Sequence, residues 1–130
     1  MMSRVEIVKL AHLIYNRVLN WRDQNRSRKV AIYYTDVCTE LHGAWPDLFP
    51  DLTERSSELN EALGYICERC RAKGLPLLPA IVWNAWKLRP GDGYPWDEHG
   101  EGEPDDEDIA KAWRAEVAKV WRAAYPAALP

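Results

Sequence analysis

Four residues of this chain have side chains of the kind that bind zinc. Cys67 and Cys70 form a C-x-x-C pair, and Cys38 and His42 lie four positions apart. Thiolate and imidazole groups are the usual ligands of tetrahedral zinc. Structural zinc usually holds such a pair at a turn, whereas these cysteines fall on the apolar stripe of a predicted helix, where cysteine behaves as a small hydrophobic residue. We therefore predict no metal site and no cofactor; whether the four side chains converge is a question for the structure.

Catalytic chemistry has little support in the sequence. The chain has neither a glycine-rich phosphate loop nor a nucleophile elbow, and its histidines, His12, His42 and His99, lie far apart. The adjacent carboxylates of Asp105 and Asp106 are explained by the start of a helix. A negative side chain near the positive N-terminal end of a helix stabilises it by about 0.3–1 kcal/mol. The sequence predicts a protein that binds and does not catalyse.

Basic residues could bind DNA phosphates. The candidate DNA-binding residues are Arg22, Arg26, Arg28, Lys29, Arg55, Lys87 and Arg89. The helix predicted over residues 53–73 is not an ordinary recognition helix, because Glu54, Glu58 and Glu61 would face phosphates there. DNA binding is therefore assigned mainly to the basic turn at residues 26–29, although a charge group of this size is more often only a solvated turn.

Acidic residues collect in the last third of the chain. Residues 1–90 hold 13 basic and 10 acidic side chains, a net charge of +3, while residues 91–130 hold 4 and 10, a net charge of −6. The excess lies in an acidic loop at about residues 97–108, which Gly100, Gly102 and Pro104 interrupt. Such a run is usually a solvated loop, but it could also occupy the basic groove of another protein. The candidate protein-binding residues are Trp96, Asp97, Glu98, Glu101, Asp105, Asp106, Glu107 and Asp108.

The elements that would position these residues follow from periodicity and capping signals. Ser3 and Glu6 have the spacing of a capping box, and apolar residues then recur at steps of three and four. Thr35 and Thr53 are predicted to cap the second and third helices, and Gly74 to end the third. The predicted elements are helices over residues 3–23, 35–43, 53–73 and 106–125 and strands over residues 30–34 and 80–86, the latter paired with residues near Tyr33 or Tyr94 as a wing.

Length and composition favour a single domain over residues 1–130. Hydrophobic residues make up 47% of the chain, enough for one core without disulfides. Three cysteines do not make a secreted disulfide framework, and no apolar run approaches the roughly 18 residues of a membrane span. We expect a cytoplasmic protein that does not enter a membrane.

The segment 74–94 carries a resemblance. A helix ends at Gly74, Leu75-Pro76 and an apolar stretch follow, and Pro90-Gly91-Asp92-Gly93-Tyr94 closes the segment. In this order of elements the chain resembles small winged-helix-like proteins of prophages and restriction-associated loci. The resemblance implies a mainly α (α+β) fold, a winged-helix-like bundle of about four helices with a small β-hairpin or wing.

From these observations we predict a non-catalytic macromolecule-binding protein. The first prediction is a winged-helix-like DNA-binding accessory or regulatory protein of phage or mobile-element type. The alternative is a phage-encoded inhibitor, of anti-CRISPR or anti-restriction type, that binds a host defence complex through its acidic surface. A homodimer through the face of Trp113 and Trp121 is also compatible with the sequence.

Overall fold

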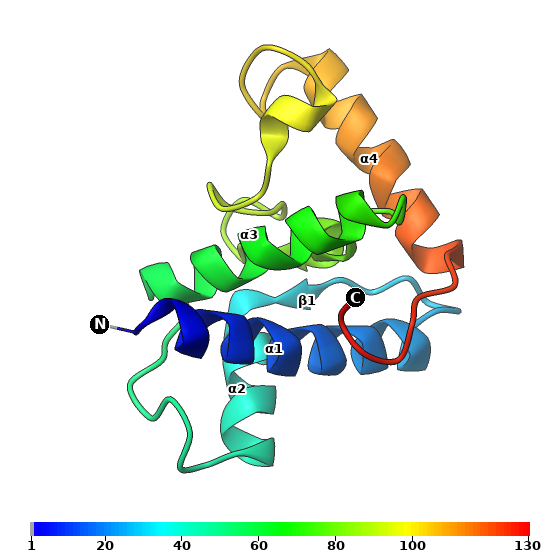
Figure 1. The fold of residues 1–130 in the computed structure, drawn as a ribbon. Coiled ribbons are helices and arrows are strands. Elements are labelled where there is room, and N and C mark those ends of the chain that lie inside the picture. The colour runs from blue at the N-terminus through cyan, green and yellow to red at the C-terminus, as the bar shows by residue number, and fades with distance from the viewer. Residues whose placement is uncertain (1) are drawn as a thin grey trace.

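The chain is mainly helical in a computed structural model that describes residues 2–130 (Figure 1). The α-helices of these residues are α1 (Arg4–Gln24), α2 (Tyr34–Ala44), α3 (Ser57–Ala72) and α4 (Glu107–Arg122). Two short 3₁₀ helices, η1 (Leu78–Ile81) and η2 (Trp96–His99), and two strands, β1 (Ile32–Tyr33) and β2 (Val82–Trp83), complete the fold. The predicted fold class is thus confirmed as a mainly helical chain with a very small sheet.

The core lies where α1 and α3 pack side by side (Figure 1). Each helix contributes a stripe of fully buried side chains at steps of three and four: Ile7, Leu10, Ile14 and Val18 from α1, and Leu59, Leu63 and Ile66 from α3. The capping box that begins α1 is confirmed, since Ser3 Oγ accepts from the Glu6 amide and Glu6 Oε1 accepts from the Ser3 amide. α1 begins and ends one residue later than predicted.

The sheet joins two distant segments, and it is parallel. Ile32 pairs with Val82 and Tyr33 with Trp83. Of the two predicted partners for a strand at 80–86, the residues near Tyr33 and those near Tyr94, the first is the one that pairs, but the predicted lengths, 30–34 and 80–86, are wrong. Pro79 has no amide hydrogen to donate to a ladder, and residues 78–81 wind into η1. Among the described residues, the antiparallel bridge between Asn84 and Arg89 is the nearest feature to a hairpin.

Two helix starts differ from the prediction because the capping residues have other partners. α2 begins at Tyr34, where the Tyr33 amide donates to Asp36 Oδ2 at 3.0 Å, so Thr35 is inside the helix. α3 begins at Ser57, since Thr53 is held in a separate turn in which its amide donates to Ser56 Oγ at 2.9 Å. α4 ends at Arg122 and not at residue 125, because Ala123 is already extended.

The C-terminal segment returns from α4 to lie beside α1 (Figure 1). Polar contacts fix it at several points: the Tyr125 hydroxyl donates to the Pro76 carbonyl at 2.6 Å, the Tyr15 hydroxyl to the Pro126 carbonyl at 2.6 Å, and Arg69 Nε to the Pro130 carbonyl at 2.7 Å. Leu129 is buried in the core. Within residues 2–130 none of the helices has both the length and the apolar character needed to cross a membrane.

Candidate nucleic-acid interface

The most prominent surface feature is a tight turn at residues 84–89, directly after β2. The Asn84 amide donates to the Arg89 carbonyl at 2.7 Å, the Leu88 amide donates to the Asn84 carbonyl at 2.8 Å, and the Trp86 amide donates to Asn84 Oδ1 at 2.8 Å. These bonds hold Trp86 at the outside of the turn, where it is 95% exposed. Among the described residues it is the most exposed of the large hydrophobic side chains.

A polar cleft lies on one side of this turn. Its volume is about 360 Å³, and its lining includes three of the seven predicted DNA-binding residues, Arg55, Lys87 and Arg89. A smaller hollow of about 160 Å³ shares Arg55 and Asn84 with the cleft and extends it to Trp86. The structure therefore brings Arg55 close to Lys87 and Arg89, which lie more than thirty positions later in the sequence, and it adds an aromatic residue beside them.

The back of the cleft is formed by hydrogen-bonded aromatic residues. The Gly91 amide donates to Tyr34 Oη at 2.6 Å, and Trp96 Nε1 donates to the Gly91 carbonyl at 3.1 Å. Burial raises the pKa of Tyr34, so its hydroxyl stays protonated at neutral pH. Sequence reasoning missed Tyr34, Asn84 and Trp86; the alternation of apolar and basic residues at 86–89 is the signal that could have found the last of these.

The charge of the cleft is only mildly positive. Glu54 and Asp92 also line it and offset part of the charge of the three cations. Asp105 forms a salt bridge with Arg89, and the hydrogen bond from this guanidinium holds the pKa of the carboxyl below its usual range. Arg55 and Lys87 are therefore the cations most available to a phosphate.

The other predicted DNA-binding residues lie elsewhere. Arg22 is only 3% exposed, and its guanidinium donates to the Val120 and Ala123 carbonyls, so its assignment to DNA is corrected to an internal contact. Arg26 is exposed but bonded to Asp23 at 3.0 Å, and Arg28 donates to Asn25 Oδ1 at 3.3 Å. Lys29 is exposed in the same turn and has a φ of 54°.

The acidic segment is exposed, but parts of it are occupied by internal contacts. Glu98 forms a salt bridge with Arg71, and Asp106 Oδ2 accepts from the Glu103 amide at 2.9 Å just before α4. The remaining predicted carboxylates, Asp97, Glu101, Glu107 and Asp108, are exposed. Trp96 is half-buried and packs on Tyr94 and Trp113, so it is not the fully exposed anchor that a protein interface would favour.

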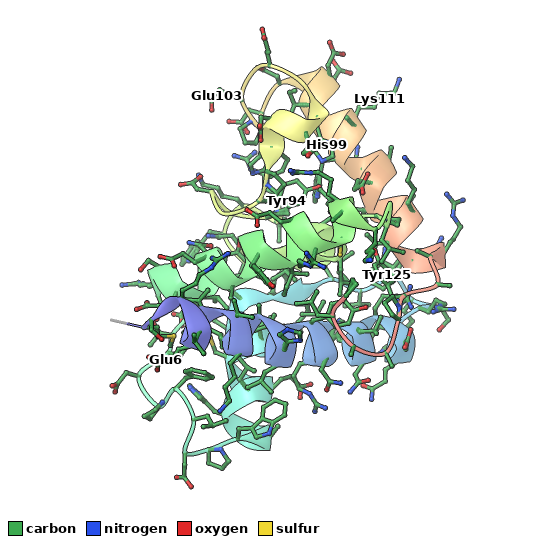
Figure 2. The ribbon with its side chains drawn as sticks, viewed as in Figure 1. Glu6, Tyr94, His99, Glu103, Lys111 and Tyr125 are labelled. Carbon is green, nitrogen blue, oxygen red and sulfur yellow. The ribbon has the colours of Figure 1, made fainter. Side chains whose placement is uncertain are left out.

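A tyrosine and a histidine, Tyr94 and His99, pair between α3 and α4 (Figure 2). Tyr94 Oη lies 2.6 Å from His99 Nε2, and the rings stack with their centroids 5.5 Å apart. Burial raises the pKa of the phenol and lowers that of the imidazole, so both groups are neutral at pH 7. The pair connects η2 to the core, and because Trp96 belongs to the same cluster, it also supports the cleft.

We expect the stability of the protein to fall as the pH drops below the ordinary histidine pKa of about 6.5. The folded state holds the pKa of His99 below that value, so the stabilisation is complete at pH 7 and is lost as the pH falls through 6.5 toward the folded-state pKa. Urea unfolding between pH 7.5 and 5 measures this loss, and His99→Gln should reduce it. The control is His12→Gln on the exposed side of α1; equal pH dependence in both variants would contradict the assignment to His99.

The cysteines do not form a metal site among the described residues. Cys38, Cys67 and Cys70 are buried and free, and burial raises the pKa of each thiol. Within residues 2–130 there is no cluster of three or more His, Cys, Asp or Glu side chains placed to hold a metal ion. The two cysteines of the C-x-x-C pair contribute apolar surface to the core instead.

Comparison with known proteins gives no relative from which a role could be transferred. No protein family, no curated protein and no solved structure matches the chain. The function must therefore be argued from the surface itself.

Proposed function

We propose that this protein binds DNA through the surface around the turn at residues 84–89, which would act as the wing of a winged-helix-like domain. The observation that supports this most is the 95% exposed Trp86, held at the outside of the turn next to the cleft that Arg55 and Lys87 line. Aromatic side chains next to cations are the usual components of a nucleic-acid surface, because bases stack on the ring while phosphates meet the charge.

In this proposal α3 is not a recognition helix. Leu59, Leu63 and Ile66 of α3 are buried in the core, and its solvent side carries Glu61 and Glu68. Carboxylates there would repel the phosphates of a duplex. The basic turn at residues 26–29 does not line the polar cleft, so its contribution to DNA binding is tested separately.

The alternative function is a protein-binding inhibitor that presents the acidic segment to a basic partner. In its favour, Asp97, Glu101, Glu107 and Asp108 are exposed at one end of the molecule. Complementary charge would steer such a complex together and set its specificity. The assignment of either function to a phage or a mobile element depends on the sequence resemblance alone.

The proposal predicts that Trp86→Ala weakens binding to single-stranded DNA by about 1–3 kcal/mol, the usual contribution of one base stacked on an aromatic side chain. Lys87→Ala should reduce the slope of log affinity against log salt by about 1, because one phosphate contact is lost. Fluorescence anisotropy with labelled oligo-dT and a mixed-sequence duplex, over a salt series, measures both effects. A triple Ala variant at positions 26, 28 and 29 tests the basic turn in the same assay.

Two further variants separate the proposals. Lys9→Ala removes an exposed cation from α1 that does not line the cleft, and it should bind DNA as the wild type does. Asp105→Asn frees Arg89, so it should strengthen DNA binding, whereas an acidic inhibitor would lose affinity for its target. If neither DNA binds at low salt, or if Trp86→Ala binds as tightly as the wild type, the DNA proposal is wrong.

A further inference from the structure

A second surface hollow, separate from the polar cleft, lies between α4 and the segment that follows β2. We call it the tryptophan groove. Its volume is about 540 Å³, and its lining consists of Lys29, Trp83, Leu88, Trp113, Arg114, Val117, Ala118 and Trp121. Six of these eight side chains are apolar, whereas the lining of the polar cleft is mainly polar and charged.

The indole groups are arranged so that the groove is apolar. Trp83 Nε1 and Trp113 Nε1 both donate to the Ala80 carbonyl, at 2.9 and 3.1 Å, and the two rings meet edge to face with centroids 5.5 Å apart. A buried indole normally directs its N–H to a partner. Because both donors point to the same internal carbonyl, it is ring carbon that faces the groove, which favours an apolar occupant. Trp113 and Trp121 form its floor, with 8% and 4% of their surface exposed, and Trp83 is half-buried.

Leu88 adds a half-exposed aliphatic side chain to the groove. It has a φ of 55°, in the left-handed region that leucine rarely adopts, and it is 54% exposed. Backbone strain of this kind persists where surrounding structure enforces it, and it is concentrated at binding sites. Here it holds an aliphatic side chain at the side of the groove, where an occupant would contact it.

The charge of the groove indicates the kind of partner. Its two charged lining residues, Lys29 and Arg114, are both basic, and none of its eight lining residues is acidic. We propose that the tryptophan groove binds a short segment of a partner protein in which aliphatic or aromatic side chains are flanked by Asp or Glu. The apolar residues of that segment fill the groove, and its carboxylates pair with Lys29 and Arg114.

The dimensions agree with such a segment. Three of the five residues that α4 contributes, at positions 113, 117 and 121, lie on one stripe of the helix and span about 12 Å at 1.5 Å per residue. Two turns of an amphipathic helix cover the same length, and a helix lying in an apolar groove is a common mode of peptide recognition.

A second copy of this chain is a poorer occupant. Its exposed tryptophan, Trp86, is followed by Lys87, which would bring another cation toward Lys29 and Arg114. Its acidic loop at residues 97–108 has the right charge, but the large apolar residues at its two ends are not free: Trp96 is half-buried and packs on Tyr94 and Trp113, and Ile109 is only 3% exposed. Neither segment combines the charge and the apolar surface that the groove requires.

The experiment selects ligands from a random peptide library displayed on phage, with the immobilised full-length protein as bait. The control bait is Lys29→Glu with Arg114→Glu, a charge reversal at two exposed positions. We expect the wild type to enrich peptides with apolar residues flanked by Asp or Glu, and the reversed variant to enrich peptides flanked by Lys or Arg. Equal enrichment by both baits, or no enrichment of acidic and apolar sequences, would overturn the proposal.

The most enriched peptide is then synthesised and titrated against three proteins. Binding should be at least about tenfold weaker for the reversed variant, and unchanged for Arg122→Glu, an exposed α4 cation outside the groove. The Trp83 and Trp113 indole N–H resonances should shift on binding and verify that each variant is folded. The proposal fails if oligo-dT causes the same shifts and displaces the peptide, because the groove then binds DNA. It also fails if the unliganded protein is a dimer that the Lys29→Glu, Arg114→Glu variant dissociates, because the groove is then occupied by a second copy of the chain.

Discussion

Arg22→Ala is expected to lower the free energy of unfolding by about 3 kcal/mol. The wild-type guanidinium is 3% exposed and donates from Nη1 to the Val120 carbonyl at 2.8 Å and to the Ala123 carbonyl at 2.6 Å. It also lies over the ring of Tyr125, with 5.1 Å between the guanidinium carbon, Cζ, and the ring centroid. Alanine would leave carbonyl groups without a donor at the end of α4, and each such buried group costs about 1–3 kcal/mol.

Urea unfolding followed by circular dichroism measures this loss, and Arg26→Ala provides the matched control. Arg26 is four positions later, exposed, and bonded only to the exposed Asp23, so its removal should change stability by no more than about 0.5 kcal/mol. A loss below about 1 kcal/mol for Arg22→Ala would show that water replaces the guanidinium and that the end of α4 is not anchored as described.

The same residue shows why the site could be only partly predicted from the sequence. Arg22 is one of four basic residues close together in the chain, and by charge alone it belongs with Arg26, Arg28 and Lys29. Its burial depends on the path of the chain after α4, which returns to place two carbonyl groups and an aromatic ring around it. No local pattern contains that information.

Local patterns did predict most of the helices. The capping box and the apolar stripe located α1 to within one residue at each end, because both signals are contained in a few neighbouring positions. The start of α3 was predicted four residues too early, since Thr53 and Ser56 are both good capping residues and tertiary packing decides between them. The sheet was harder still: a parallel pair joins residues fifty positions apart, and its direction depends on the whole crossover.

The polar cleft and the tryptophan groove depend on that crossover. β2 lies beside β1, so the turn at residues 84–89 leaves the sheet next to the start of α2, and Lys87 comes near Arg55. On the other side of the turn, Trp83 meets Trp113 of α4. The sequence contained the tryptophans and the cations, but only the arrangement of the elements separates them into one polar hollow and one apolar hollow.

Gly93→Ala is expected to destabilise the protein by about 2 kcal/mol, because the segment before η2 crosses α3 with no room for a side chain. A methyl group at position 93 would lie 2.9 Å from Asn60 Cβ, 3.0 Å from the Asn60 carbonyl oxygen and 3.1 Å from its Cα. These atoms belong to the first turns of α3 and cannot rotate away, so the segment that contains residue 93 must move away from α3. The change is measured by urea unfolding of the variant beside the wild type.

Gly64→Ala tests the same contact between the two segments from the α3 side, and it should stabilise the protein where Gly93→Ala destabilises it. Its added methyl group would lie 3.6 Å from the Gly93 carbonyl oxygen, an ordinary contact, and alanine within α3 is favoured over glycine by about 0.5–1 kcal/mol. Since Gly91 and Asp92 line the polar cleft, lifting the segment in Gly93→Ala should also weaken DNA binding, while Gly64→Ala should leave it intact. A Gly93→Ala variant as stable as the wild type would mean that the segment at residue 93 does not pack tightly against α3. The back of the cleft would then be less rigid than the hydrogen bonds of Gly91 to Tyr34 and Trp96 indicate.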